Sequence, residues 1–336
     1  MDLTTQYLGL ELEHPVVASA GPLSQTLAGV EALAAGGASA IVLYSLFEEQ
    51  LRAEVARDEQ LIDVQSNAFA EALDYFPTAP ITTKSAAFSY LSLVERAAKS
   101  VDVPIIASLN GADLGGWVEF SREVADAGAA AIELNIYMVP GDVKTSGDLV
   151  VKRHLEIVSA VSDAVNIPVS VKMSPYFSAV GNVALQLVDA GAAGLVMFNR
   201  FLNPDVDIET LNTDAEFELS TPQEGRLPRT WIASLRNHTT ASLAGSSGVE
   251  SSDDVVKYLL AGADVVMTTA ALIRHGRGYT RELVGGLQSW MVRKGFVSLD
   301  QVRGMLAVPT VWDGEAVRRG GYVSAIQAAK ARYGAL

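Results

Sequence analysis

Apolar and polar positions along this chain form two alternating kinds of segment. In one kind, apolar residues recur three and four positions apart, as in amphipathic helices; this pattern covers residues 27–35, 90–99, 117–127, 155–164, 180–190 and 253–261. The other kind is a short apolar run without polar alternation, typical of strands buried on both faces of a parallel sheet. These runs lie at residues 15–19, 40–43, 104–108, 131–134, 169–172, 195–198, 240–244 and 264–267. The alternation predicts a (β/α)8 barrel. A doubly wound open sheet is the alternative, and it would be unusually wide.

A repeated phrase joins several helices to the next strand. Its copies are Ala35-Gly36-Gly37-Ala38, Ala127-Gly128-Ala129, Ala190-Gly191-Ala192 and Ala261-Gly262-Ala263. Glycine directly after a helix can adopt the left-handed conformation that ends the last turn. The repeat therefore predicts the same helix-to-strand connection at each copy.

Two stretches interrupt this rhythm, at about 47–87 and 200–228, each after the carboxyl end of a predicted strand. Long insertions of this kind are commonly lids or binding loops, so we expect both over the mouth of the barrel. Ser252 before Asp253-Asp254 predicts a helix start. Helices expected at 280–294 and 324–333, and an extension at about 296–336, are predicted to pack on one domain spanning residues 1–336.

Composition narrows the possible functions. The 336 residues carry a net charge of -14, which argues against a nucleic-acid surface because phosphate binding relies on Lys and Arg. There is no Cys, which excludes disulfides, a cysteine nucleophile and cysteine-bound iron–sulfur clusters, and the four His are scattered, so we predict no metal site. The polar amino-terminal residues and the lack of an apolar run of about 20 residues predict a cytoplasmic protein without a membrane anchor.

In a barrel of this kind, the residues after each strand assemble the active site. Small or polar residues stand at these places: Ala20 and Gly21, Tyr44 and Ser45, Asn110, Asn135, Lys172, Asn199 and Arg200, Ser246, Ser247 and Gly248, and Thr268 and Thr269. Polar residues also mark the ends of ordinary strands, so a single Asn carries little weight, and the set as a whole carries more.

Lys172 and the Ser246-Ser247-Gly248 loop indicate a phosphorylated ligand. Lys172 directly follows an apolar run, and a cation near a core needs an anion or dipole unless its stem carries it to solvent. Loops after the seventh and eighth strands of such barrels often bind phosphate. A phosphate there and a cation across the mouth suggest FMN, whose reduced ring a nearby Lys stabilises.

These residues resemble the dihydroorotate dehydrogenase family of FMN-binding barrels. Glu133-Leu134-Asn135 is similar to the family's Glu-Leu-Asn, and Val171-Lys172-Met173-Ser174-Pro175 is similar to its Val-Lys-Leu-Ser/Pro-Pro. The resemblance implies that Lys172 contacts the flavin as a catalytic residue. It also implies that Ala20, Gly21, Ser45, Asn110 and Asn135 line the flavin, and that Ser246, Ser247, Gly248, Thr268 and Thr269 lie near its phosphate. Asn135, Asn199 and Arg200 would contact substrate, although Arg200 could equally form a structural ion pair.

The chain also departs from the family pattern. Met138 stands where the family has its Cys or Ser base, Tyr44 where it has a Lys before Ser45, and Thr269 where it usually has a Gly. A thioether is a poor proton acceptor. Tyr137, or Lys144 in the same loop, is then the candidate acid, and either could be a surface residue.

Three functions remain open on this basis. The first is an FMN-dependent oxidoreductase that oxidises dihydroorotate, in the context of pyrimidine biosynthesis, or acts on a related C–C bond. The second is a flavin- or phosphate-binding barrel that has lost catalysis, as Met138 and Tyr44 suggest. The third is a cofactor-free lyase or isomerase with Lys172 as a Schiff-base amine. The family also makes a homodimer plausible.

Overall fold

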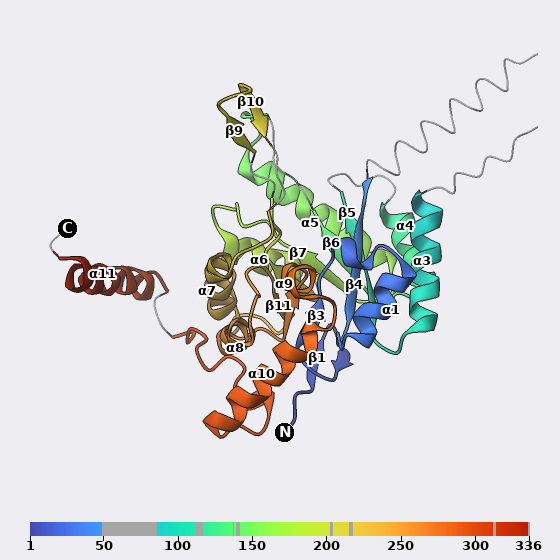
Figure 1. Ribbon diagram of the computed structural model, residues 1–336. Coiled ribbons are helices and arrows are strands. Elements are labelled where there is room, and N and C mark those ends of the chain that lie inside the picture. The colour runs from blue at the N-terminus through green and yellow to red at the C-terminus, as the bar shows by residue number, and fades with distance from the viewer. Residues whose placement is uncertain are drawn as a thin grey trace, which may run out of the picture.

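Eight parallel strands close into a barrel in a computed structural model that describes residues 1–48, 86–111, 117–136, 138, 142–201, 204–214, 218–311 and 314–334 (Figure 1). Around the barrel they follow the order β11-β12-β3-β4-β5-β6-β7-β8. Their bounds are β3 Val16–Ala18, β4 Ile41–Phe47, β5 Ile105–Asn110, β6 Ala131–Asn135, β7 Val169–Lys172, β8 Gly194–Met197, β11 Ser242–Gly245 and β12 Val265–Thr268. The closed sheet confirms the (β/α)8 prediction and excludes the open-sheet alternative.

Helices follow most strands and cover the outside of the barrel (Figure 1). They are α1 Leu27–Ala35, α3 Ala86–Ser100, α4 Trp117–Asp126, α5 Gly147–Ala164, α6 Val180–Asp189, α7 Arg226–Leu235, α8 Ser252–Ala261, α9 Ala270–His275, α10 Tyr279–Lys294 and α11 Gly314–Tyr333. Short 3-10 turns lie at η1 Pro22–Ser24, η2 Pro222–Gly225 and η3 Leu299–Gln301. The apolar faces of the helices and the outward faces of the strands form the larger of two buried clusters.

The repeated Ala-Gly phrase forms the predicted helix-to-strand connection. Gly37, Gly128, Gly191 and Gly262 have φ of +93°, +100°, +109° and +116°, the left-handed region that L side chains avoid. In each copy, an Ala follows a turn that only glycine adopts without strain, and the strand begins two or three residues later.

The structure corrects one helix prediction and confirms another. Helix α7 lies where no helix was predicted, and it carries Pro228 in its first turn, where proline is tolerated. The predicted helix start at Ser252 is confirmed, because α8 begins there, and Ser251 is its N-cap in a capping box with Asp254.

The amino end of the barrel is closed by a hairpin of β1 (Thr5–Tyr7) and β2 (Leu10–Leu12), which the sequence analysis missed. Tyr7, Leu8 and Leu12 are buried with inward-facing strand residues in the second cluster. The other end of the barrel is therefore the open one, where the strand carboxyl ends lie.

The predicted insertions and extension are only partly described. Most of 47–87 lies outside the described residues, whereas the second insertion contains a hairpin of β9 (Asp205–Asp207) and β10 (Asn212–Asp214) that projects from the barrel (Figure 1). Helix α10 packs against α8 as expected. The side chains of α11 from Arg319 onward are almost all exposed, so the packing expected of this helix is not seen. No helix in the described part of the chain has the length and apolarity needed to cross a membrane.

Candidate functional site

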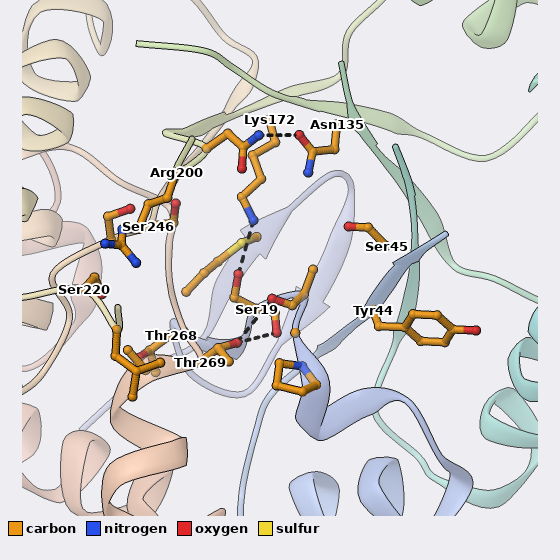
Figure 2. Close-up of a pocket in the computed structure, with 18 of the residues that line it drawn as sticks. Ser19, Tyr44, Ser45, Asn135, Lys172, Arg200, Ser220, Ser246, Thr268 and Thr269 are labelled. Carbon is orange, nitrogen blue, oxygen red and sulfur yellow. Dashed lines mark hydrogen bonds between the residues drawn. The ribbon is translucent and has the colours of Figure 1, made fainter. Parts of the chain in front are cut away.

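A cavity of about 750 Å³ opens at the carboxyl ends of the strands. This volume lies within the range of small-molecule and cofactor sites, roughly 300–1,000 Å³. Figure 2 shows side chains from opposite sides of the barrel meeting there. The sequence-predicted residues that line it are Ala20, Gly21, Tyr44, Ser45, Asn110, Asn135, Lys172, Asn199, Arg200, Ser246, Ser247, Thr268 and Thr269.

Strand register places three of these residues at one level. Asn110 on β5 pairs with Asn135 on β6, which pairs with Lys172 on β7. Paired residues of neighbouring strands point to the same face of a sheet. The Asn199 amide donates a hydrogen bond of 2.7 Å to Asn135 Oδ1, which fixes the orientation of both amides at the cavity wall.

A β-bulge in β4 decides which of Tyr44 and Ser45 faces the cavity centre. The register with β5 shifts between Val42 and Ser45, so that Ser45 is opposite Ser108 and the two hydroxyls lie 2.8 Å apart. In Figure 2 Ser45 points toward the cavity, whereas the Tyr44 hydroxyl points away from it. The Tyr44 ring packs edge-to-face on Tyr90, and burial raises the pKa of Tyr44. Tyr44 therefore contributes a wall and not a charge.

The loop after β11 is held from behind by Tyr258 on α8. The Tyr258 hydroxyl lies 2.7 Å from the carbonyl oxygens of both Ser246 and Ser247, and burial raises its pKa. Ser247 and Gly248 have φ of +71° and +65°, so the backbone turns sharply at this point. Gly248 does not line the cavity, and its N–H donates to Ser220 Oγ at 3.2 Å. Ser246, Ser247 and Val249 are thus the residues of this loop that line the cavity.

The loop after β12 completes the wall beside β3. The Thr268 hydroxyl donates to the carbonyl oxygen of Val249 at 3.1 Å, and the Thr269 hydroxyl donates to that of Ser19 at 2.7 Å. A Cβ on Gly21 would lie 2.6 Å from Thr269 Cγ2, so this close approach requires glycine. Both hydroxyl hydrogens are therefore engaged. Helix α9 begins directly after Thr269, and the N–H groups of a first helical turn have no partner inside the helix, which makes them candidate donors to an anion.

Two cations line the cavity, with different degrees of freedom. Lys172 is 9% exposed, and its Nζ lies 3.5 Å from both Ser19 Oγ and Glu133 Oε1. Arg200 Nε donates to Glu224 Oε2 at 2.8 Å, and this pair is about one-third exposed. Arg200 thus forms the ion pair that the sequence analysis held open, while still bordering the cavity.

Only one of the two candidate acids in the loop after β6 can be placed. Tyr137 lies outside the described residues, whereas Lys144 is exposed and does not line the cavity. Met138 lines a separate hollow between α5 and α6. Among the described residues that line the main cavity there is no Asp, Glu or His, so its charged groups are the cations Lys172 and Arg200.

The family model and the curated relatives that match this chain all carry the description dihydroorotate dehydrogenase. The family model described as dihydroorotate dehydrogenase matches residues 82–291. The chain is 26% identical over 311 residues to the catalytic subunit of a dihydroorotate dehydrogenase B (NAD(+)) of Methanothermobacter thermautotrophicus, covering 90% of this chain and 98% of the relative. It is 25% identical over 312 residues to the same subunit of Thermoplasma acidophilum, with the same coverage. A putative dihydroorotate dehydrogenase A (fumarate) of Aeropyrum pernix is 28% identical over 218 residues, 63% of this chain and 70% of the relative.

Proposed function

This chain belongs to the dihydroorotate dehydrogenase family, and on that premise we propose that it is an FMN-dependent oxidoreductase acting on a C–C bond of a small anionic substrate. Dihydroorotate is the substrate that the relatives' names suggest, in which case the chain serves pyrimidine biosynthesis. The observation that carries the proposal is the gathering of Lys172 and the loops after β11 and β12 around one cavity (Figure 2).

The residues of the cavity fit FMN in their donor chemistry. The Ser246-Ser247 loop and the start of α9 supply backbone N–H groups suited to a phosphate. Lys172 supplies a cation for the electron-rich part of the ring, and the amides of Asn110 and Asn135 can hydrogen-bond its polar edge. When bound, FMN would supply the hydride chemistry that amino acid side chains lack.

The protein's own contribution is then binding, charge and orientation. Lys172 stabilises negative charge that develops beside it. The hydrogen-bonded pair of Asn135 and Asn199 orients a substrate at the cavity wall, and Arg200 offers positive charge at the rim. We assign proton transfer to Tyr137, on sequence grounds alone, because phenols are reasonable acids.

The visible absorption of the purified protein tests the cofactor. Protein that is yellow, or takes up one equivalent of FMN, supports the proposal, and colourless protein that binds no FMN contradicts it. Lys172→Ala should weaken FMN binding about 10- to 150-fold, the equivalent of one lost charge-assisted hydrogen bond. Lys152→Ala is the matched control because Lys152 is 70% exposed on α5 and pairs only with Glu156 among the described residues.

A binding protein without catalysis is the second candidate, favoured by the lack of Asp, Glu and His among the described cavity residues. Anaerobic mixing with dihydroorotate separates the two. Bleaching of the visible flavin band supports the oxidoreductase. A flavin that binds but does not bleach with any dihydropyrimidine supports the binding protein.

A further inference from the structure

Beneath the cavity, the barrel encloses a carboxylate that the proposed function does not use. Glu133 lies in the middle of β6, in register with Ser108 on β5 and Ser170 on β7. Its side chain is fully buried. Its Oε1 lies 3.5 Å from Lys172 Nζ, and its Oε2 has no hydrogen-bond partner among the described residues. Such a group is costly in a core unless a charge of opposite sign compensates it.

The surroundings of Glu133 offer one compensating charge. Among the described residues, Lys172 is the only cation within 4.0 Å of its carboxylate. The other titratable groups that feel its charge are tyrosines, Tyr7 of the amino-terminal hairpin and Tyr90 of α3, whose pKa values are raised first by burial and also by Glu133. Ser170 Oγ donates to the Ile132 carbonyl, and Ser108 Oγ shares with Ser45 Oγ a hydrogen bond in which either hydroxyl could be the donor. The buried Tyr7 hydroxyl has no hydrogen-bond partner among the described residues, and a neutral hydroxyl does not supply a compensating charge. The two buried charges therefore depend on each other.

The same geometry fixes the direction of the ammonium. Two contacts hold Lys172 Nζ. One is to Glu133 on the neighbouring strand, and the other is to Ser19 on the facing side of the barrel, as Figure 2 shows. An ammonium has three donors, which leaves one for the cavity that Lys172 lines. A lysine held in this way presents a charge at a fixed point.

We propose that Glu133 is a positioning residue whose carboxylate pairs with the Lys172 ammonium and fixes it inside the barrel, so that Lys172 recognises an anionic group and does not serve as a nucleophilic amine. The pairing itself is independent of the ligand, and only the identification of that anionic group with FMN rests on the proposed function. The inference also disfavours the Schiff-base lyase, which needs the neutral amine.

A melting-temperature cycle on the full-length protein tests the pairing, using Glu133→Gln, Lys172→Met and the double variant. Either single change leaves one buried charge unpaired and should lower the melting temperature by about 5 °C or more. In the Lys172→Met background, Glu133→Gln should instead raise it, because it removes the stranded carboxylate. This reversal of sign is not expected of a residue that serves packing alone. Additive losses in the double variant would overturn the proposal.

The exposed pair of Lys152 and Glu156 on α5 is the matched control. Its atoms lie 3.6 Å apart, as close as the buried pair, but both side chains are largely exposed. Glu156→Gln and Lys152→Met should each change the melting temperature by less than about 1 °C, and additively.

A second readout remains decisive if Lys172→Met does not fold. Reductive methylation of wild-type protein and of Glu133→Gln, at matched flavin content, is followed by mass spectrometry of the peptide containing Lys172. Loss of the carboxylate that engages its Nζ leaves Lys172 without its ion-pair partner, so Lys172 should react at least about tenfold faster in the variant. Equal rates would overturn the proposal. Neither readout needs flavin chemistry, so a protein that binds no FMN refutes the proposed function and leaves this test intact.

Discussion

Tyr258→Phe is the sharpest test of how the loop after β11 is built. The change removes one oxygen that lies 2.7 Å from the carbonyl oxygens of Ser246 and Ser247, and leaves the ring in place. The ring is closely fitted, because a Cβ on Gly245 would lie 2.2 Å from its Cδ1 atom. Phenylalanine keeps this contact, so the variant isolates the hydroxyl.

The expected loss in the free energy of unfolding follows from the number of carbonyl groups left without a donor. The hydroxyl has one hydrogen for two carbonyls, and stranding a buried acceptor costs about 1–3 kcal/mol. A loss of this size should lower the melting temperature by roughly 1.5–4 °C in a chain of this length. If FMN binding must reorder the freed loop, its affinity falls by about 1–2 kcal/mol, which is about 5- to 30-fold.

Thermal unfolding and FMN titration measure the two effects separately. Tyr279→Phe is the control, since the Tyr279 hydroxyl also donates to a backbone carbonyl, that of Glu250 at 3.2 Å, but Tyr279 does not line the cavity. The control should melt slightly lower and bind FMN normally. A Tyr258→Phe protein that melts lower yet binds FMN as tightly as wild type would refute the assignment of this loop to the ligand. An unchanged melting temperature would refute the hydrogen-bond argument.

Two further predictions concern the loop and the pH dependence of stability. Gly248→Ala should destabilise the protein by more than about 2 kcal/mol and impair ligand binding, because a Cβ there would lie 2.5 Å from Gly225 N and φ is +65°. Chemical denaturation measures this change in the free energy of unfolding, and a loss below about 0.5 kcal/mol would contradict the prediction. Burial lowers the pKa of His154 below its ordinary 6.5, so the unfolded chain binds a proton that the folded protein does not. Its contribution to stability should therefore fall as pH drops below about 6.5, by at most about 1.4 kcal/mol per pH unit, and level off below the folded pKa. His154→Leu should remove that share of the slope in denaturant titrations at several pH values, and an unaltered slope would show that His154 contributes none.

The repeating architecture could be predicted from the sequence because its causes are local. A strand covered on both faces, such as β7, needs an uninterrupted apolar run, and a helix that must turn into it ends on a glycine such as Gly191. The same apolar runs also predict where each strand ends. Asn110, Asn135 and Lys172 could therefore be placed at one rim before any coordinates were known.

Features that depend on contacts between distant segments could not be predicted in this way. The bulge that turns Ser45 inward arises from the pairing of β4 with β5, and the ion pair of Arg200 with Glu224 joins two loops. Neither leaves a local pattern. The hairpin of β1 and β2 was missed because its three-residue strands are too short to show periodicity.

Glu133 illustrates the difference between what the sequence determines and what the tertiary structure determines. The sequence by itself determined that an acidic residue stands inside the apolar run 131–134, two positions before Asn135 at the barrel rim. Only the closed sheet decided that its carboxylate lies 3.5 Å from the ammonium of Lys172, on the next strand and 39 positions along the chain. Residue order fixes which groups each strand carries to the interior, whereas strand pairing and barrel closure fix which of those buried charges meet, and a charge in a core is tolerated only where they do.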